Sequence, residues 1–319
     1  MKKSFAIPSL LLAALAVPAV LAAQSGVGTA GAQVLQLPAG SRAPAFAGAY
    51  TATSDDADVL FYDPAGLAGL GRSVSVAYQN YFEGIRAGSA AAAFNLGGLV
   101  LGGGLLYLDA GSIDVIEPDP NFGNQRGKAT GTTASASEVA ARVSAATSLM
   151  GGRVRLGANL GVVSSDLAGV GRSAPFVDLG AQYAMSRVAV GVSVRHLGTS
   201  MTNATNGDAP LPSEARLGIA VRGLQVSGFG VGLSADGLYR LEEGTTGLVT
   251  GLEAGLIPGA YGPFSAVLRA GLSVDRGDVL APYRFGAGIS FGSVAVDYTY
   301  QDYNLLGAVH RIGLRWTTP

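Results

Sequence analysis

The amino-acid sequence predicts an all-β fold, a transmembrane antiparallel up-and-down β-barrel of about 14 strands with an N-terminal plug. The first observation is composition, because 48% hydrophobic residues, 13% charged residues and a mean hydropathy of +0.35 are too apolar for an ordinary soluble domain. The second is that polar residues or glycine interrupt every apolar run beyond the N-terminus before it reaches the ~18 residues of a membrane-spanning helix. The third is that many of the 48 glycines lie in apolar stretches, where they disfavour a helix but suit closely packed strands.

The N-terminus has the order of a secretory signal peptide. Two lysines follow Met1, an apolar run covers 5–21, and small residues precede the expected cleavage point. We therefore expect a signal peptide over 1–23, a plug over 24–71 and a barrel over 72–319, with export to the bacterial outer membrane. The chain contains no cysteine, so a lipid anchor on a cysteine at the cleavage point is excluded.

The charge of the chain argues against a nucleic-acid partner. Without the two signal-peptide lysines, 19 basic residues stand against 22 acidic residues, so the net charge is 19 minus 22, or −3. Of these 19 basic residues 18 are arginine and only Lys128 is lysine. Arginine keeps its charge and binds carboxylates in a planar fork, so the positions of these arginines become important.

The barrel region divides into segments of about 9 to 11 residues, the length that crosses a bilayer as a tilted strand. The predicted strands are 73–82, 88–96, 99–110, 136–148, 152–164, 174–184, 187–198, 214–222, 228–240, 247–257, 264–274, 282–291, 293–301 and 307–317.

Alternation within these strands separates an apolar face from a charged face. Val188, Val190 and Val192 share one face, for example, while Arg195 lies on the other. Arginine on the lipid face at the bilayer midplane costs ~2 to 4 kcal/mol, so the charged face is predicted to point into the lumen. The charges predicted to face the lumen are Arg142, Arg155, Asp178, Arg195, Arg216, Asp236, Glu253, Arg269, Arg284, Asp297, Arg311 and Arg315.

Connection lengths also fit a barrel, because short periplasmic turns alternate with longer extracellular loops in this fold. The even strand count then places both termini in the periplasm, with the outer wall in the lipid bilayer and the loops at a lipopolysaccharide-type outer leaflet. The expected long loops are 111–135, 165–173, 199–213, 241–246 and 302–306.

The region 24–71 differs from the strands. It lacks sustained period-two alternation and contains Pro38, Pro44 and Pro64. It is nevertheless apolar enough to be buried, and the barrel lumen is the available place. We therefore interpret it as a plug or hatch.

This hatch carries recognisable motifs. Residues 31–42 read GAQVLQLPAGSR, residues 46–50 read FAGAY, and residues 55–67 read DDADVLFYDPAGL. The segment resembles the N-terminal segment of PorV/PorQ-like proteins, which belong to the FadL-type group of fourteen-stranded outer-membrane barrels. The group usually has Asn-Pro-Ala-Gly-Leu, whereas this chain has aspartate first, and both residues can cap a turn before proline. The residues that carry the motif are Arg42, Gly48, Asp55, Asp56, Asp58, Asp63, Pro64, Ala65, Gly66 and Leu67.

The resemblance implies two different functions. FadL-type members admit long-chain fatty acids and other hydrophobic compounds through the hatch and a lateral opening, so the leading hypothesis is a channel for hydrophobic small molecules. PorV-like members act in type IX secretion and hold exported proteins after translocation. That secretion role, with secreted proteins or the secretion machinery as partners, is the alternative.

Two residue clusters have competing interpretations. Asp55, Asp56 and Asp58 could bind a hard cation, but such a cluster more often forms a turn or helix start, and pairing of one of them with Arg42 is the preferred interpretation. The lumen arginines could attract an anionic group, but mutual pairing with the lumen carboxylates is favoured. No metal, cofactor or nucleic acid is therefore expected.

Catalysis is not expected either. The only histidines are His196 and His310, both near strand ends on the predicted outward face. A triad would also need a serine and a carboxylate beside one of them, and no Gly-x-Ser-x-Gly motif is present.

Overall fold

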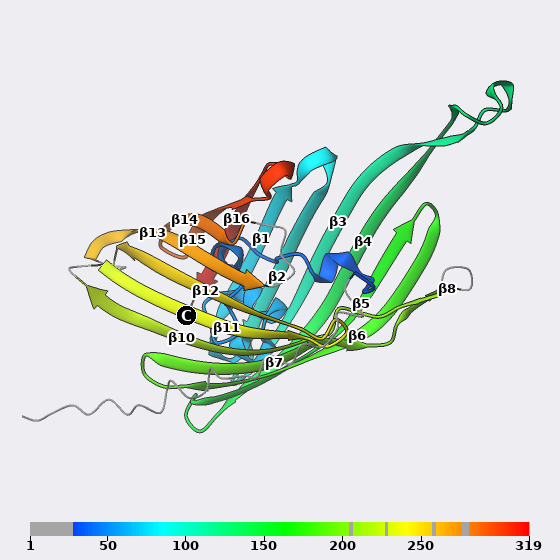
Figure 1. Cartoon of the computed structure of the whole chain (residues 1–319). Helices are drawn as coiled ribbons and strands as arrows, with labels where there is room; N and C mark the ends of the chain where they lie inside the picture. The colour runs from blue at the N-terminus through cyan, green and yellow to red at the C-terminus, as the bar shows by residue number, and fades with distance from the viewer. Residues whose placement is uncertain (1–27, 204–206, 227–228, 257–259, 276–280, 319) are drawn as a thin grey trace, which may run out of the picture.

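The computed structural model describes residues 28–203, 207–226, 229–256, 260–275 and 281–318, so the predicted signal peptide lies outside the described residues. Fourteen antiparallel strands form a closed barrel, and the ring closes where β1 pairs with β16 (Figure 1). The predicted fourteen-stranded barrel is confirmed. The strands are β1 (Arg72–Asn80), β2 (Arg86–Asn95), β3 (Leu99–Pro118), β4 (Gly127–Leu149), β5 (Val154–Leu167), β6 (Val170–Ala184), β7 (Val188–Gly198), β10 (Glu214–Val226), β11 (Phe229–Arg240), β12 (Thr245–Leu256), β13 (Ala260–Asp275), β14 (Tyr283–Phe291), β15 (Val294–Asp302) and β16 (Ala308–Thr318).

The outer surface of the barrel is apolar. Large side chains such as Leu105, Val143 and Ile312 are exposed there, although each belongs to a well-paired strand. A soluble protein rarely exposes a contiguous apolar surface of this extent, so the wall fits a lipid environment. No helix in the described part of the chain is long and apolar enough to cross a bilayer.

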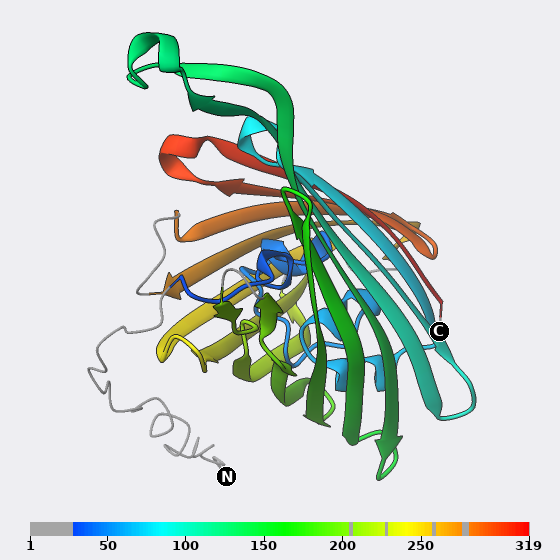
Figure 2. The same ribbon diagram turned by 90° about the vertical axis from the view of Figure 1, so that its right-hand side faces the viewer.

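Two expected loops are largely strand. The β3 and β4 strands stay paired as far as Pro118 and Gly127, and together they leave the barrel as a long ribbon (Figures 1 and 2). The β5 and β6 strands pair up to Leu167 and Val170, so little of the expected loop 165–173 remains. Apolar alternation stops where both faces of a strand meet water, and it therefore marks the edge of the apolar surface rather than the end of the strand.

The remaining long loop, 199–213, contains a small hairpin of β8 (Met201–Asn203) and β9 (Gly207–Ala209). It folds back toward the barrel, because Met201 and Leu211 belong to the same buried apolar cluster as Phe176 on β6. The loop is also tied to the start of the chain by a hydrogen bond from the Gly31 amide to the Pro210 carbonyl.

The N-terminal segment, which we define as residues 28–71, lies inside the barrel (Figure 2). It contains the short helices η3 (Gln33–Leu35), α1 (Arg42–Ala45), η4 (Ala57–Phe61) and η5 (Pro64–Gly69). Asp56 caps η4 by accepting from the Asp58 amide, and Asp63 caps η5 by accepting from the Ala65 amide. These side-chain caps fold a proline-containing stretch locally, where no strand pairing is available.

Inward-facing glycines make room for this segment. A β-carbon on Gly157 would collide with the backbone of Pro64, and one on Gly271 would collide with the backbone amide of Ala47. The same close approach recurs around the barrel. A β-carbon would likewise collide at Gly104 with Leu60, at Gly180 with Asp63, at Gly191 with Thr51, at Gly251 with Phe46 and at Gly313 with Ser41. The many glycines of the strands thus line the surface on which the segment packs.

Candidate functional site

The twelve predicted lumen charges all lie on the inward side of their strands, and the structure places eleven of them in two groups. One group lies toward the end of the barrel with the short turns and joins Arg42, Asp55 and Asp56 of the N-terminal segment. The other lies toward the end with the long loops, where four of its members line a cavity. The first group contains Glu253, Arg269, Asp297 and Arg315, and the second contains Arg142, Asp178, Arg195, Arg216, Asp236, Arg284 and Arg311. Arg155 stands apart from both groups and donates to Ser54 of the segment.

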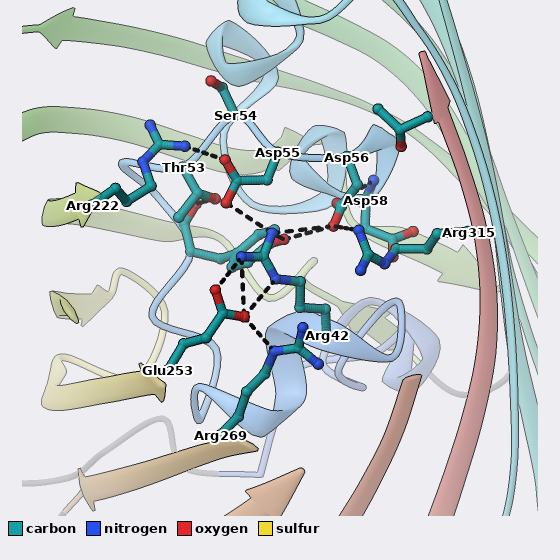
Figure 3. Close-up of polar contacts among 12 residues, drawn as sticks. Arg42, Thr53, Ser54, Asp55, Asp56, Asp58, Arg222, Glu253, Arg269 and Arg315 are labelled. Atoms are coloured by element: carbon teal, nitrogen blue, oxygen red, sulfur yellow. Dashed lines mark hydrogen bonds and ion pairs between the residues drawn. The ribbon is translucent and has the colours of Figure 1, made fainter. Parts of the chain in front are cut away.

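The first group forms a ring of alternating charges that joins the segment to the wall. Figure 3 shows the part of this ring around Arg42, with Glu253, Arg269, Asp56 and Arg315. Two members, Arg42 and Asp56, come from the segment, and the others come from β12, β13, β15 and β16. Within the ring, each of the three guanidinium groups contacts two of the three carboxylates, so the charges balance. The links are Arg42 to Glu253 (3.0 Å), Glu253 to Arg269 (2.6 Å), Arg269 to Asp297 (2.6 Å), Asp297 to Arg315 (2.5 Å), Arg315 to Asp56 (3.4 Å) and Asp56 to Arg42 (3.8 Å).

Asp55 extends this ring toward β10. Its carboxylate accepts from Arg42 at 2.8 Å and also pairs with Arg222. Burial alone would raise the pKa of Asp55, but Arg42 and Arg222 hold it well below its ordinary value. The carboxylate oxygens of Asp55 and Asp56 therefore pair with arginine guanidinium groups. No cluster of metal-ligating side chains is found among the described residues.

Asp58 differs from its two neighbours. Among the described residues, the Ser75 hydroxyl is the only hydrogen-bond donor to the Asp58 side chain, at 2.5 Å, and the other carboxylate oxygen has no partner. Burial, and then the charge of Asp56, raise the pKa of Asp58 above its ordinary value. The side chain is 1% exposed, so a protonated carboxyl is the form that suits this position.

The other motif residues hold the segment in place. The Gly48 carbonyl accepts from Arg216 at 2.9 Å, and a β-carbon on Gly66 would collide with the Thr53 carbonyl. Pro64, Ala65 and Leu67 are buried against β4, β5 and β6, which contact η5. Arg155 of β5 donates to Ser54 of the segment at 2.7 Å. These residues act as packing and anchoring groups.

A cavity of about 380 Å³ lies between the segment and the long-loop end of the barrel. Phe61 and Tyr62 of the segment border it on one side, and Leu238, Val249 and Leu106 add apolar wall. Its other lining includes charged side chains of both signs, so the cavity is amphiphilic. The cationic lining residues are Arg142, Arg195, Arg216, Arg240 and Arg284, and the anionic ones are Glu214, Glu242 and Glu243.

Arginine side chains pack on the aromatic rings of the segment. The Arg142 guanidinium lies 5.0 Å from the Phe61 ring centroid and 4.9 Å from that of Phe176, and it pairs with Asp178 at 3.0 Å. The Arg195 guanidinium likewise lies 5.7 Å from the ring centroid of Tyr62. Such cation–π contacts are worth about 2 kcal/mol when desolvated.

Two features of this region are not predicted by the sequence. Glu214 bridges Arg195, at 2.5 Å, and Arg216, but it stands at a strand start where alternation carries little signal. The expectation that His196 points outward is wrong. A positive φ of 57° at His196 interrupts β7, so the side chain is buried at 2% exposure and packs on Phe176.

No family model and no curated protein matches the sequence. Solved structures do match. The Ralstonia pickettii toluene transporter TbuX is 14% identical with a TM-score of 0.58, over 88% of this chain and 98% of that chain. A Pseudomonas aeruginosa FadL homologue is 11% identical (TM-score 0.50, 88% and 99% covered), and the Pseudomonas putida toluene transporter TodX is 10% identical (TM-score 0.50, 83% and 94% covered).

At such identities the similarity concerns the fold. The narrower resemblance to PorV/PorQ-like proteins and the secretion role receive no support from these comparisons. The chain therefore has the fold of the FadL-type outer-membrane barrels.

Proposed function

We propose that the protein is a passive outer-membrane channel for small hydrophobic molecules, with the N-terminal segment as its hatch. The observation that carries the proposal is the lumen, where the segment packs against the wall and leaves a cavity of about 380 Å³ on its long-loop side. A porin keeps a water-filled channel instead. The size of the cavity falls within the range of small-molecule sites, and its lining combines apolar side chains with charged ones.

The direction of entry follows from the topology. The chain passes from the segment into β1 at the short-turn end, and an even strand count brings β16 back to that end. With the short turns in the periplasm, the cavity opens toward the cell exterior. Hydrophobic molecules would thus enter from the long-loop side and meet the hatch.

The comparisons support the substrate class. TbuX and TodX carry the description of toluene transporters, and the TodX structures also that of a monoaromatic hydrocarbon channel. Strand pairing is continuous around the barrel of this chain. We therefore expect displacement of the hatch, rather than a gap between strands, to control passage.

Uptake by whole cells tests this proposal, because an intact outer membrane slows hydrocarbon entry. Cells that lack other hydrocarbon channels should accumulate labelled toluene faster when they express the protein. A variant without residues 28–71 should fold as a barrel, as checked by gel mobility before and after heating, and should conduct ions in planar bilayers. Equal toluene uptake with and without the protein would refute the transport function, and equal ion conductance of both forms would refute the hatch.

A further inference from the structure

The two ends of the barrel differ in the charges of the connections between strands. The connections at the short-turn end are 96–98, 150–153, 185–187, 227–228, 257–259 and 292–293, and they contain Arg153 and Arg187 but no aspartate or glutamate. The connections at the long-loop end contain six acidic residues and two arginines, which are Glu83, Asp119, Asp208, Glu242, Glu243, Asp278, Arg126 and Arg276. The sequence therefore makes the short-turn end basic and the long-loop end acidic.

Four arginines, which we call the basic rim, gather at the short-turn end on neighbouring strands. They are Arg153, Arg155, Arg187 and Arg222. Arg187 and Arg222 are cross-strand neighbours, because the Arg222 amide donates to the Arg187 carbonyl at 2.8 Å. The Arg153 carbonyl accepts from the amide of Ala184, the last residue of β6, at 2.7 Å. The chain then turns through 185–187, so Arg153 and Arg187 flank the end of the same strand.

The N-terminal segment connects Arg155 with this group. Ser54 accepts a hydrogen bond from Arg155 at 2.7 Å, and the next residue, Asp55, pairs with Arg222. Figure 3 shows Arg222 in contact with the Asp55 carboxylate, with Ser54 next to it. Among the described residues, Asp55 is the only carboxylate that pairs with the basic rim, and it also pairs with Arg42 at 2.8 Å. The basic rim therefore shares a single negative charge with another arginine.

The other three arginines of the basic rim have no counterion in the described part of the chain. Arg155 contacts the neutral side chains of Ser54 and Gln182, at 2.7 and 3.5 Å, and its buried Nε–H has no acceptor. Arg153 and Arg187 are exposed to water, and neither forms an ion pair with a described residue. Arginine stays charged at physiological pH, so the positive charges of these three side chains remain uncompensated.

A partner with several carboxylates suits the basic rim better than a single small anion. One ion pair at an exposed arginine contributes little, because water and salt screen it. An acidic segment can contact several arginines at once, so the loss of translational freedom on binding occurs only once. Guanidinium groups also bind carboxylates through two parallel hydrogen bonds. The basic rim therefore favours an acidic peptide segment.

The position of the basic rim favours a protein partner over lipid headgroups. Arg187 shares the parity of Ala189 on β7. Arg222 shares the parity of Ala220 on β10. Both alanines are buried on the inward face, where they pack with Ala52 of the N-terminal segment. The basic rim thus borders the mouth of the lumen, which a soluble protein reaches from the periplasm, whereas phospholipid headgroups surround the outward face of the wall.

We propose that the short-turn mouth of the barrel is a docking surface for a periplasmic protein that presents an acidic segment, whose carboxylates bind Arg153, Arg155 and Arg187. The bound segment lies beside residues 53–55 of the hatch. The acidic long-loop end repels the same segment, so charge complementarity selects one end of the molecule. This inference goes beyond the proposed function, because it does not depend on which molecule passes the hatch.

The test measures binding of fluorescently labelled oligoglutamate to the full mature chain in phosphatidylcholine nanodiscs, by fluorescence anisotropy. Oligoglutamate should bind and should weaken as salt is added, whereas oligoglutamine of the same length should not bind. The double variant Arg153→Gln/Arg187→Gln should bind oligoglutamate about tenfold more weakly, a change that the loss of two exposed ion pairs can produce. The matched control Arg126→Gln/Lys128→Gln removes two exposed cations from the far end of the β3–β4 ribbon and should bind as the wild type does.

Three outcomes would overturn the inference. The first is that oligoglutamate does not bind the wild type, and the second is that both double variants, shown to be folded by gel mobility before and after heating, bind it equally well. The third uses nanodiscs that also contain anionic phosphatidylglycerol. If this lipid abolishes the difference between the wild type and Arg153→Gln/Arg187→Gln, lipid headgroups occupy the basic rim. Toluene uptake by whole cells is measured separately, so each of these results leaves the proposed function intact.

Discussion

The two ends of the lumen surround arginine with different partners. Near the short turns, the ring and its Asp55 branch contain four arginines and four carboxylates, and both ring arginines from the wall contact two carboxylates each. Near the long loops, Arg142 and Arg195 each pair with one carboxylate and also pack on an aromatic ring, and Arg311 has no carboxylate within ion-pair distance among the described residues. A closed ring of balanced charges therefore marks where the N-terminal segment is anchored to the wall.

The largest expected effect separates these two ends directly. Arg42→Met should lower the free energy of unfolding by about 3 kcal/mol, because it leaves Asp55, Asp56 and Glu253 with one arginine fewer in a buried setting. Unfolding by urea in lipid vesicles can be followed through Trp316, the only tryptophan of the chain. Arg311→Gln removes no ion pair between described residues and takes away a buried charge, so it should not lower the free energy of unfolding. Equal losses in both variants would abolish the distinction between the two ends.

The next prediction concerns the close packing of the N-terminal segment against the barrel wall. Gly157→Ala should destabilise the barrel by about 1 to 3 kcal/mol, because its new methyl group would meet the backbone of Pro64, which cannot rotate away. Gly237→Ala is the matched control, since its β-carbon would lie 4.0 Å from the nearest atom on the exposed face of β11. The same urea titration measures both. If both substitutions lower the free energy of unfolding equally, the N-terminal segment does not pack against the wall at Gly157 as described.

The smallest effect concerns pH. Because the folded state raises the pKa of Asp58, the unfolded chain ionises first as pH rises above about 4, and stability then falls with increasing pH through the raised folded pKa. Asp58→Asn keeps an acceptor for Ser75 and cannot ionise, so it should be more stable than the wild type at neutral pH and less dependent on pH between 4 and 8. Parallel melting curves for the two proteins across this range would exclude titration of Asp58.

The sequence predicted the barrel well because lipid imposes a strict rule on strands. Alternation placed residues such as Arg269 and Asp297 on the inward face, and the structure shows them there. Alternation could not show which charges meet, since Arg42 and Glu253 are 211 positions apart and meet only because the N-terminal segment packs inside the barrel. The irregular backbone at His196 was equally hidden, because one residue with positive φ reverses the alternation without any change in composition.

The charge ring also constrains the order of assembly. It joins Arg42 and Asp56, which precede every barrel strand, to Arg315 on the last strand. The ring is therefore incomplete until β16 arrives and pairs with β1, so the N-terminal segment must already be inside when that seam closes. Contacts between such distant parts of a chain form slowly, and an unclosed sheet exposes two strand edges while it waits. We expect biogenesis of this protein to depend on factors that hold the open barrel around its hatch until the final strand has paired.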